Sequence, residues 1–472
     1  MKSIKSFFFL FVSLFVGFLN VFALDQNGDK VQFTLEEAIN QALMANRIIA
    51  SAIDYVTQSS FSLISTKAEF ELKIFPEVYA DLSKERKNYG AGLSFSKKLP
   101  TGTNFMFTPT IQKIGNVYET EAYLSLTQPL LKGISPSYNL SGVKQSEYYL
   151  RISQRELYLT QVNIVLSTIS AVYDVIKKRE MLRLHQSSYD RLQGFSEAAV
   201  VKQKMGLATA IDVYRAKIKL KQAESFLLSG QESYQDALDD LKIILAVPLD
   251  QMIDVYAPLK YNIVRIDEPK ALEVSLQERV ELQQLKDMIS NLELQSEAAK
   301  HNLLPNLDLV LKYTSKGSDV NLHESIQNNR GSFEVGLASS GSVKRTVERV
   351  AFEKSKLEIR SAERILSLRQ DEIKREVKFV LRNLYRAEKN IDIQNEQIAQ
   401  ARGKLELSKV KFSHGLGDNF DLIEAESELR QAEINLITAV IDYIVGGYRL
   451  REAMGTLIDS QGRLSFEKTP SE

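Results

Sequence analysis

Apolar residues recur along two long tracts of this chain with the spacing of amphipathic helices. The first tract runs from about Ser141 to Lys204, and the helical spacing then returns through Leu241. The second runs from Val343 through Arg402 to Gly415, and back to about Met454. At 1.5 Å per residue, a tract of about 64 residues would reach roughly 95 Å. Paired helices of that length predict coiled-coil packing.

Between the helical tracts the spacing of apolar residues changes to every second position, which predicts β-strands. In the second half of the chain, two such segments are centred on Leu311 and Val335. The first half holds four candidate segments, at Val78 to Leu82, Leu93 to Phe95, Phe105 to Phe107 and Ala122 to Leu126, with turns at Pro100-Thr101-Gly102 and Gly115-Asn116. We expect two of these four to be membrane strands and the remainder a longer hairpin or loop.

The chain contains two copies of one plan. Residues Gly206 to Glu224 align with Gly415 to Glu433 at an offset of 209 residues, and eight of the nineteen positions are identical. Phe75-Pro76 and Leu304-Pro305, where a helix should end and a strand begin, align at an offset of 229 residues. A duplication explains both matches, and the first copy then holds about 20 more residues, most simply in its strands.

These boundaries predict a signal peptide at residues 1–23, a first repeat at 24–245 with its tip near 206, a linker at 246–274, a second repeat at 275–457 with its tip near 415, and a tail at 458–472. The strands are expected at about 76–128 and 305–340. Lys2 and Lys5 precede an apolar run from Phe7 to Phe18, as in a secretory signal, although a membrane anchor is the alternative.

After the predicted signal peptide, we expect no membrane-spanning helix, because no stretch contains the roughly 20 apolar residues that such a helix needs. The nearest, Ile434 to Tyr448, contains Asp442. Membrane insertion would therefore need β-strands closed into a barrel, and without such strands the exported protein would be soluble.

Composition excludes several functions. The 60 basic and 60 acidic residues balance, so no excess positive charge points to nucleic acid. Cysteine is absent, and the four histidines are scattered along the chain. No catalytic constellation or glycine-rich phosphate loop is recognisable, so we expect neither enzymatic activity nor a cofactor. Tryptophan is also absent, which leaves Tyr and Phe to form any aromatic girdle at a membrane surface.

Several motifs together resemble the outer-membrane efflux protein family typified by TolC. They are Phe33-Thr34-Leu35-Glu36-Glu37-Ala38, Leu126-Thr127-Gln128-Pro129-Leu130-Leu131-Lys132-Gly133 and the paired Gly-Leu…Asp segments. The resemblance implies a mixed α and β membrane protein, with four transmembrane strands in each protomer. It implies a homotrimer with a twelve-stranded β-barrel in outer-membrane lipid and a long α-helical barrel in the periplasm. A periplasmic adaptor and an inner-membrane transporter would be its partners.

The same resemblance assigns roles to residues at the two predicted tips. Asp421 and Glu424 would ring the closed entrance, with Phe412 and Asp212 in the same network; the family usually has a tyrosine where this chain has Phe412. Adaptor contact falls on Gly206, Leu207, Gly415 and Leu416. Simpler roles stay open, because first-turn carboxylates favour a helix dipole, Asp212 suits a helix cap and glycines suit tight turns.

Two other interpretations of the sequence compete with an outer-membrane duct. A periplasmic or surface coiled-coil adaptor would have helices of similar length but no lipid-facing strands and no pore. A secreted enzyme on a helical stalk would need a compact catalytic domain, for which the duplicated plan leaves no room.

Overall fold

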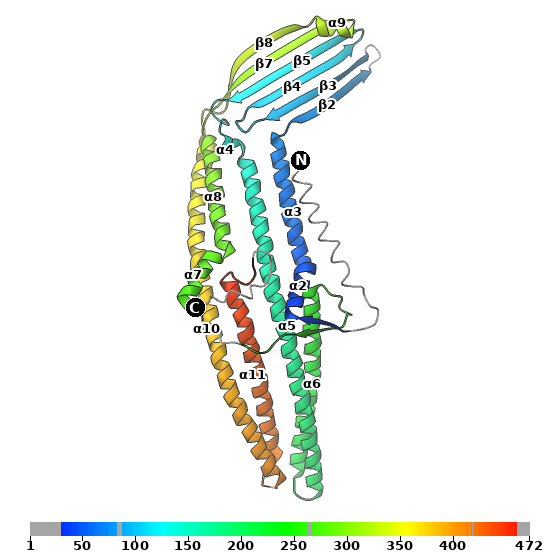
Figure 1. Ribbon diagram of the computed structural model, residues 1–472, viewed down its shortest axis with the longest axis vertical. Coiled ribbons are helices and arrows are strands. Elements are labelled where there is room, and N and C mark those ends of the chain that lie inside the picture. The colour runs from blue at the N-terminus through cyan, green and yellow to red at the C-terminus, as the bar shows by residue number, and fades with distance from the viewer. Residues whose placement is uncertain (1–29, 83–86, 262–265, 415, 418, 460–472) are drawn as a thin grey trace. The chain divides into compact units, whose positions relative to one another are not determined.

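The computed structural model describes residues 30–82, 87–261, 266–414, 416–417 and 419–459 (Figure 1). The predicted signal peptide and most of the predicted tail lie outside these residues. The chain forms two compact units, each made of separate segments: Met1–Arg47, Ile164–Val264 and Asn383–Tyr448 in unit 1, and Ile48–Asn163, Arg265–Arg382 and Arg449–Glu472 in unit 2. Each unit therefore takes segments from both predicted repeats.

Unit 2 contains an antiparallel sheet of six strands in the order β2-β3-β4-β5-β7-β8 (Figure 1). The strands are β2 (Lys73–Leu82), β3 (Lys87–Lys98), β4 (Asn104–Ile114), β5 (Val117–Pro129), β7 (Asn306–Asp319) and β8 (Arg330–Ser340). All four candidate segments of the first half pair in this one sheet. Which two of them are membrane strands, with the remainder a longer hairpin or loop, stays a prediction.

The two aligned prolines, Pro76 and Pro305, occupy different places in the structure. Helix α3 (Arg47–Lys67) and a 3-10 turn (Ala68–Phe70) end before Pro76, which lies inside β2. Pro305, in contrast, lies between helix α8 (Val280–His301) and β7. The prediction that both prolines mark the change from helix to strand was wrong for the first. Proline lacks a backbone N–H, and an edge strand such as β2 tolerates that loss.

A short helix, α9 (Leu322–Gln327), connects β7 to β8 and was not predicted. It packs closely on the end of the sheet. A Cβ added to Gly317 would lie only 1.7 Å from the carbonyl oxygen of Ser325. The Thr120 hydroxyl donates a hydrogen bond of 2.9 Å to that same oxygen. Only glycine fits at position 317 while α9 stays in place.

A buried arginine ties together the helical part of unit 2, which includes α4 (Pro136–Asn139) and α7 (Glu268–Glu278). Arg279 lies between α7 and α8 and its side chain is only 5% exposed. Its guanidinium lies 2.7 Å from Glu281, 3.2 Å from Glu376 and 3.7 Å from Glu452. Burial raises the pKa of Glu452 despite that neighbouring positive charge.

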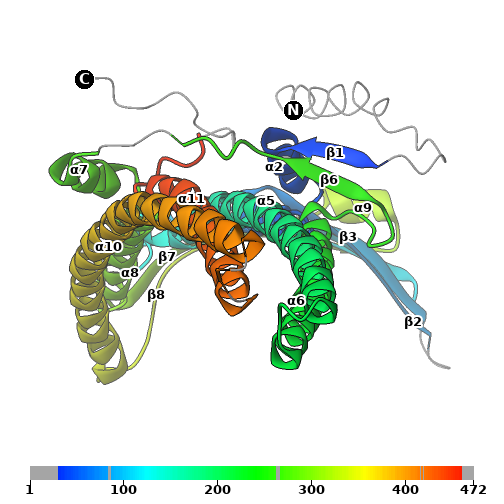
Figure 2. The same cartoon turned by 90° about the horizontal axis from the view of Figure 1, so that it is seen from below.

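Unit 1 contains a small parallel pair of strands, β1 (Val31–Thr34) and β6 (Ile253–Tyr256), beside helix α2 (Leu35–Ala45) (Figure 2). The predicted capping box at Thr34 and Glu37 begins α2. Asp254 of β6 accepts hydrogen bonds from Lys30 at 3.0 Å and Arg179 at 3.1 Å. These contacts fix the start of the described chain to a strand far away in the sequence.

Two long helical hairpins form the rest of unit 1. Helices α5 (Ser141–Lys204) and α6 (Ala210–Leu245) lie side by side, and so do α10 (Thr346–Ser413) and α11 (Asn419–Ala453) (Figures 1 and 2). The first parts of α5 and α10 belong to unit 2. Helix α5 has the bounds that its apolar spacing predicts, and α10 begins three residues later than expected.

One described helix, α5, contains a stretch that is long and apolar enough to cross a membrane, by length and composition. The expectation that no later stretch reaches this level was therefore wrong. Half of that stretch is buried inside the protein, as in the core helix of a soluble protein. Val165, Ile169 and Val172 of α5 are completely buried.

Candidate functional site at the helical tips

The two hairpin turns share one backbone hydrogen bond. In the first, the N–H of Leu207 donates to the carbonyl of Lys202 at 2.9 Å, and in the second the N–H of Leu416 donates to Lys411 at 2.9 Å. Both bonds link residues five apart, as in the motif that ends many helices with a left-handed residue. Gly206 supplies that residue, with φ of +75°. Its counterpart, Gly415, lies outside the described residues.

Large apolar side chains project from these turns. Leu207 is 73% exposed and Leu416 is 81% exposed, and Met205 beside the first turn is also mostly exposed. The buried clusters between the helices of the two hairpins do not include either leucine. The turns therefore present apolar surface that another protein can cover.

Asp212 has a local structural role in the described chain. Its carboxylate accepts hydrogen bonds from the Thr209 hydroxyl at 2.6 Å and from the Thr209 backbone N–H at 3.0 Å. The Thr209 hydroxyl also accepts from the Asp212 N–H, which completes a capping box at the start of α6. The hydrogen bonds from Thr209 lower the pKa of Asp212. Of the two roles predicted for this residue, the structure shows the helix cap.

Phe412 links the two tips. Its ring is half-buried against the core of the second hairpin, and the ammonium of Lys202 lies 3.5 Å from the ring centroid. The same ammonium donates to the backbone carbonyl of Phe412. Lys202 belongs to α5 and Phe412 to α10, so this cation–π contact fastens the end of one hairpin to the end of the other.

The predicted entrance carboxylates lie on one exposed side of α11. Asp421 is exposed in the first turn of the helix. Glu424 is also exposed, and its carboxylate lies 3.5 Å from the ammonium of Lys404, which lies 2.8 Å from Glu428. The Glu424 charge is thus partly balanced within the protomer by Lys404.

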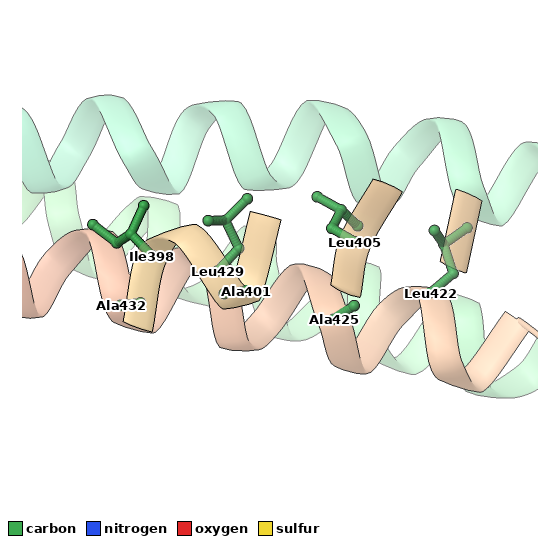
Figure 3. Close-up of a cluster of buried hydrophobic side chains, with 7 residues drawn as sticks. All are labelled: Ile398, Ala401, Leu405, Leu422, Ala425, Leu429 and Ala432. Atoms are coloured by element: carbon green, nitrogen blue, oxygen red, sulfur yellow. The ribbon is translucent and has the colours of Figure 1, made fainter. Parts of the chain in front are cut away.

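The seam between α10 and α11 is packed with alternating large and small side chains (Figure 3). The alanines let the helix backbones approach closely, and the larger residues fill the space beside them. This seam holds Asp421 and Glu424 on a rigid helix. Its members are Ile398, Ala401, Leu405, Leu422, Ala425, Leu429 and Ala432.

The same helix also carries a buried ion pair, which was not predicted from the sequence. Glu426 of α11 has no exposed side-chain surface, and its two oxygens lie 2.6 and 2.7 Å from the guanidinium of Arg191 on α5. The signal was present, since Glu426 occupies an apolar-face position between Leu422 and Leu429. A carboxylate at such a position needs a charged partner.

A stacked cluster adjoins this ion pair. The guanidinium of Arg430 lies 4.8 Å from the ring centroid of Phe226, and His185 stacks on the same ring at 5.8 Å between centroids. Burial, and secondarily the charge of Arg430, lowers the pKa of His185. Helices α5, α6 and α11 meet in this cluster. No group of three or more potential metal-ligating side chains occurs in the described part of the chain.

Known proteins that resemble this chain in sequence or in fold are outer-membrane proteins. The chain is 21% identical over 374 residues to outer membrane protein TolC of Salmonella enteritidis, across 75% of this chain and 72% of that protein. The outer membrane protein VceC of Vibrio cholerae superposes with a TM-score of 0.70 at 14% identity, covering 89% of this chain and 96% of that one. No family model matches.

The CmeC outer membrane channel of Campylobacter jejuni has the same fold, with a TM-score of 0.68 at 12% identity over 91% of this chain and 86% of that chain. A strand sheet combined with two long helical hairpins in one chain is the fold that these solved structures share with this protein. The chain is thus similar in sequence to TolC and shares its fold with the outer-membrane proteins VceC and CmeC.

Proposed function

We propose that this chain is one subunit of a homotrimeric exit duct, which lets substrates leave through the outer membrane without performing chemistry. One observation carries the proposal: a single chain joins an antiparallel sheet to two long helical hairpins, as TolC-like channels do. A coiled-coil adaptor has no use for such a sheet. A periplasmic adaptor and an inner-membrane transporter supply the substrate and the energy.

The entrance of the duct is formed at the helical tips. Three copies of Asp421 and Glu424 place six carboxylates around one axis, which favours cations over anions. Phe412 holds the tips closed through Lys202, and Asp212 fixes the start of α6. Lys404 partly balances the charge of Glu424 within the protomer.

Single-channel recording in planar bilayers tests the duct. The mature protein should form cation-selective pores, and Asp421→Ala with Glu424→Ala should reduce the cation preference. Glu428→Ala is the matched control, because Glu428 is an exposed acid one turn along α11 that shares Lys404. Failure of the purified protein to form any pore would favour the coiled-coil adaptor instead.

The adaptor docks on the two turns, at Gly206, Leu207, Gly415 and Leu416. Exposure of Leu207 and Leu416 supports this proposal. A photo-crosslinking residue at either leucine should capture a periplasmic protein in cells. The same residue at Glu406, an exposed position of α10 about two turns from the tip, should capture far less. Equal capture at all three positions would argue against docking on the turns.

A further inference from the structure

The sheet of unit 2 has one apolar and one polar face across all six strands. One row of paired residues, with one member from each strand, is entirely apolar or aromatic: Ile74, Phe95, Phe107, Leu124, Tyr313 and Phe333. The adjacent row is Lys73, Ser96, Met106, Ser125, Lys312 and Glu334. Neighbouring residues of a strand point to opposite faces, so the two rows lie on opposite sides of the sheet.

Within the described residues, the apolar face is exposed at both edges of the sheet and half-buried between them. Ile74 is 54% exposed, Tyr313 is 44% exposed and Phe333 is 66% exposed. These residues span the sheet from β2 at one edge to β8 at the other. A continuous apolar face of this width, with a polar face behind it, is what lipid on one side and water on the other require.

The hairpin β2–β3 meets the same requirements as the other strands. A tilted membrane strand needs about 9 to 11 residues. Strand β2 has 10 residues and β3 has 12, compared with 11 in β8. Because β2 and β3 continue both the apolar row and the polar row, they belong in the lipid with β4, β5, β7 and β8.

Both edges of the sheet need a partner. In the described chain β2 pairs only with β3, and β8 pairs only with β7. Unpaired backbone groups in lipid cost several kcal/mol each, by order of magnitude. Six strands are too few to close on themselves, since barrels begin at about eight. Each edge must therefore pair with another copy of the chain.

We propose that β2 of each subunit pairs with β8 of the next, so that three chains close a barrel of eighteen strands instead of twelve. This inference rests on the trimer proposed above. An even number of alternating strands makes β8 of one copy antiparallel to β2 of the next, as the ladder requires. With strands about 4.8 Å apart and tilted by about 40°, the backbone radius is roughly 18 Å, against roughly 12 Å for twelve strands.

Disulfide cross-linking tests the interface directly, because the chain contains no cysteine of its own. Glu77→Cys on the polar face of β2 is combined, one pair at a time, with cysteine at Ser332, Glu334, Gly336 or Ala338 on the polar face of β8. The assembled protein in proteoliposomes is oxidised with copper phenanthroline and run on non-reducing gels. Within one chain these positions lie on opposite edges of the sheet and cannot join.

The matched control replaces Glu77→Cys with Met106→Cys on β4, which becomes the edge if only β4, β5, β7 and β8 form the barrel. At least one Glu77 pair should give ten-fold more covalent trimer than any Met106 pair. Cross-linking through Met106 alone, or through neither residue, in a trimer that still conducts would overturn the eighteen-stranded barrel and leave the duct intact. A monomer without pores would refute the duct itself.

Lipid exposure of β2 gives an independent measurement. A bimane label on Val78→Cys should be quenched by brominated lipid as strongly as one on Val335→Cys of β8, and a label on Glu77→Cys should be quenched several-fold less. Val78 and Val335 are 82% and 63% exposed in the single chain. Equal quenching at Val78 and Glu77 would place β2 outside the lipid and overturn the proposal.

Discussion

Helices α6 and α11 are the second arms of the two hairpins, and they align in the duplicated sequence but differ in what they expose. On α6, Ile211, Tyr214 and Ile218 are each more than half exposed. On α11, the equivalent positions hold Phe420, Ile423 and Ser427, of which Ile423 is buried, and the acids Asp421 and Glu424 are exposed beside them. The position equivalent to exposed Lys217 of α6 holds Glu426 on α11, which is completely buried.

This difference shows that one helical plan now serves two environments. Helix α11 packs against α5 through a buried ion pair and turns acids outward, toward water in the proposed entrance. Helix α6 turns an apolar strip outward, and exposed apolar strips of this size mark protein interfaces. In the proposed trimer, that strip contacts the neighbouring subunit.

The largest effect is expected from breaking the ion pair that distinguishes α11. Arg191→Met leaves the Glu426 carboxylate buried without its hydrogen-bonding partner, which should destabilise unit 1 by about 3 kcal/mol. Combining it with Glu426→Leu should recover most of that loss, because two apolar residues can replace a buried pair. Thermal unfolding measured by circular dichroism reports both changes.

Lys217→Met is the matched control, since it alters the equivalent position of α6, where the side chain is exposed. It should change stability by less than about 0.5 kcal/mol. Equal losses from Lys217→Met and Arg191→Met would contradict the contrast between the two helices.

The next effect concerns the apolar strip of α6. Ile218→Glu should weaken trimer formation, because it places a carboxylate in a surface that another subunit covers. Light scattering of the detergent-solubilised protein measures the loss of trimer. Lys221→Glu, one turn away and already exposed beside Glu224, should leave the trimer intact. A stable Ile218→Glu trimer would show that the strip faces something else.

A smaller effect on the free energy of unfolding is expected from replacing glycine by alanine, and its sign should differ between the tip turn and the helix interior. Gly206→Ala forces alanine into a left-handed conformation and should cost about 1 to 2 kcal/mol. Gly403→Ala, inside α10, should stabilise by about 0.5 to 1 kcal/mol. An added Cβ meets no atom within 4 Å at either position, so the difference comes from the backbone alone. Chemical denaturation of the two variants provides the comparison.

The smallest effect is a pH dependence where α5, α6 and α11 meet. The folded protein holds the pKa of His185 below its ordinary value. Between that folded pKa and about 6.5, the unfolded chain binds more protons, so stability should fall as the pH is lowered. His185→Gln should remove this part of the dependence. Melting temperatures between pH 7 and pH 5 test it, and identical slopes for both proteins would exclude His185.

Much of the fold could be predicted because long elements carry strong periodic signals. The apolar spacing of α5 gives its bounds, and alternation identifies every strand of the large sheet. Strands β1 and β6 were missed because four residues are too few to show a period. The sequence could not show that all four candidate segments of its first half pair in one sheet, since alternation marks a strand but not the sheet that it joins.

The site was less predictable, for a reason visible in particular residues. The cap formed by Asp212 is local in sequence, and it was one of the two roles expected. The contacts of Lys202 with Phe412 and of Arg191 with Glu426 join residues more than 200 positions apart. Nothing in one sequence shows which residues meet across such a separation, and the pore-lining role of Asp421 and Glu424 remains a prediction.

The pairing of β1 with β6 also has a consequence for the order of folding. Val31 pairs with Ile253, so the contact closes a loop of about 220 residues. Contacts between residues so far apart form late, because the intervening chain must first be made and brought together. Val31 and Phe33 are synthesised and exported more than 200 residues ahead of Ile253 and Val255, with which they pair. The first strand of the described chain is thus among the last to be completed.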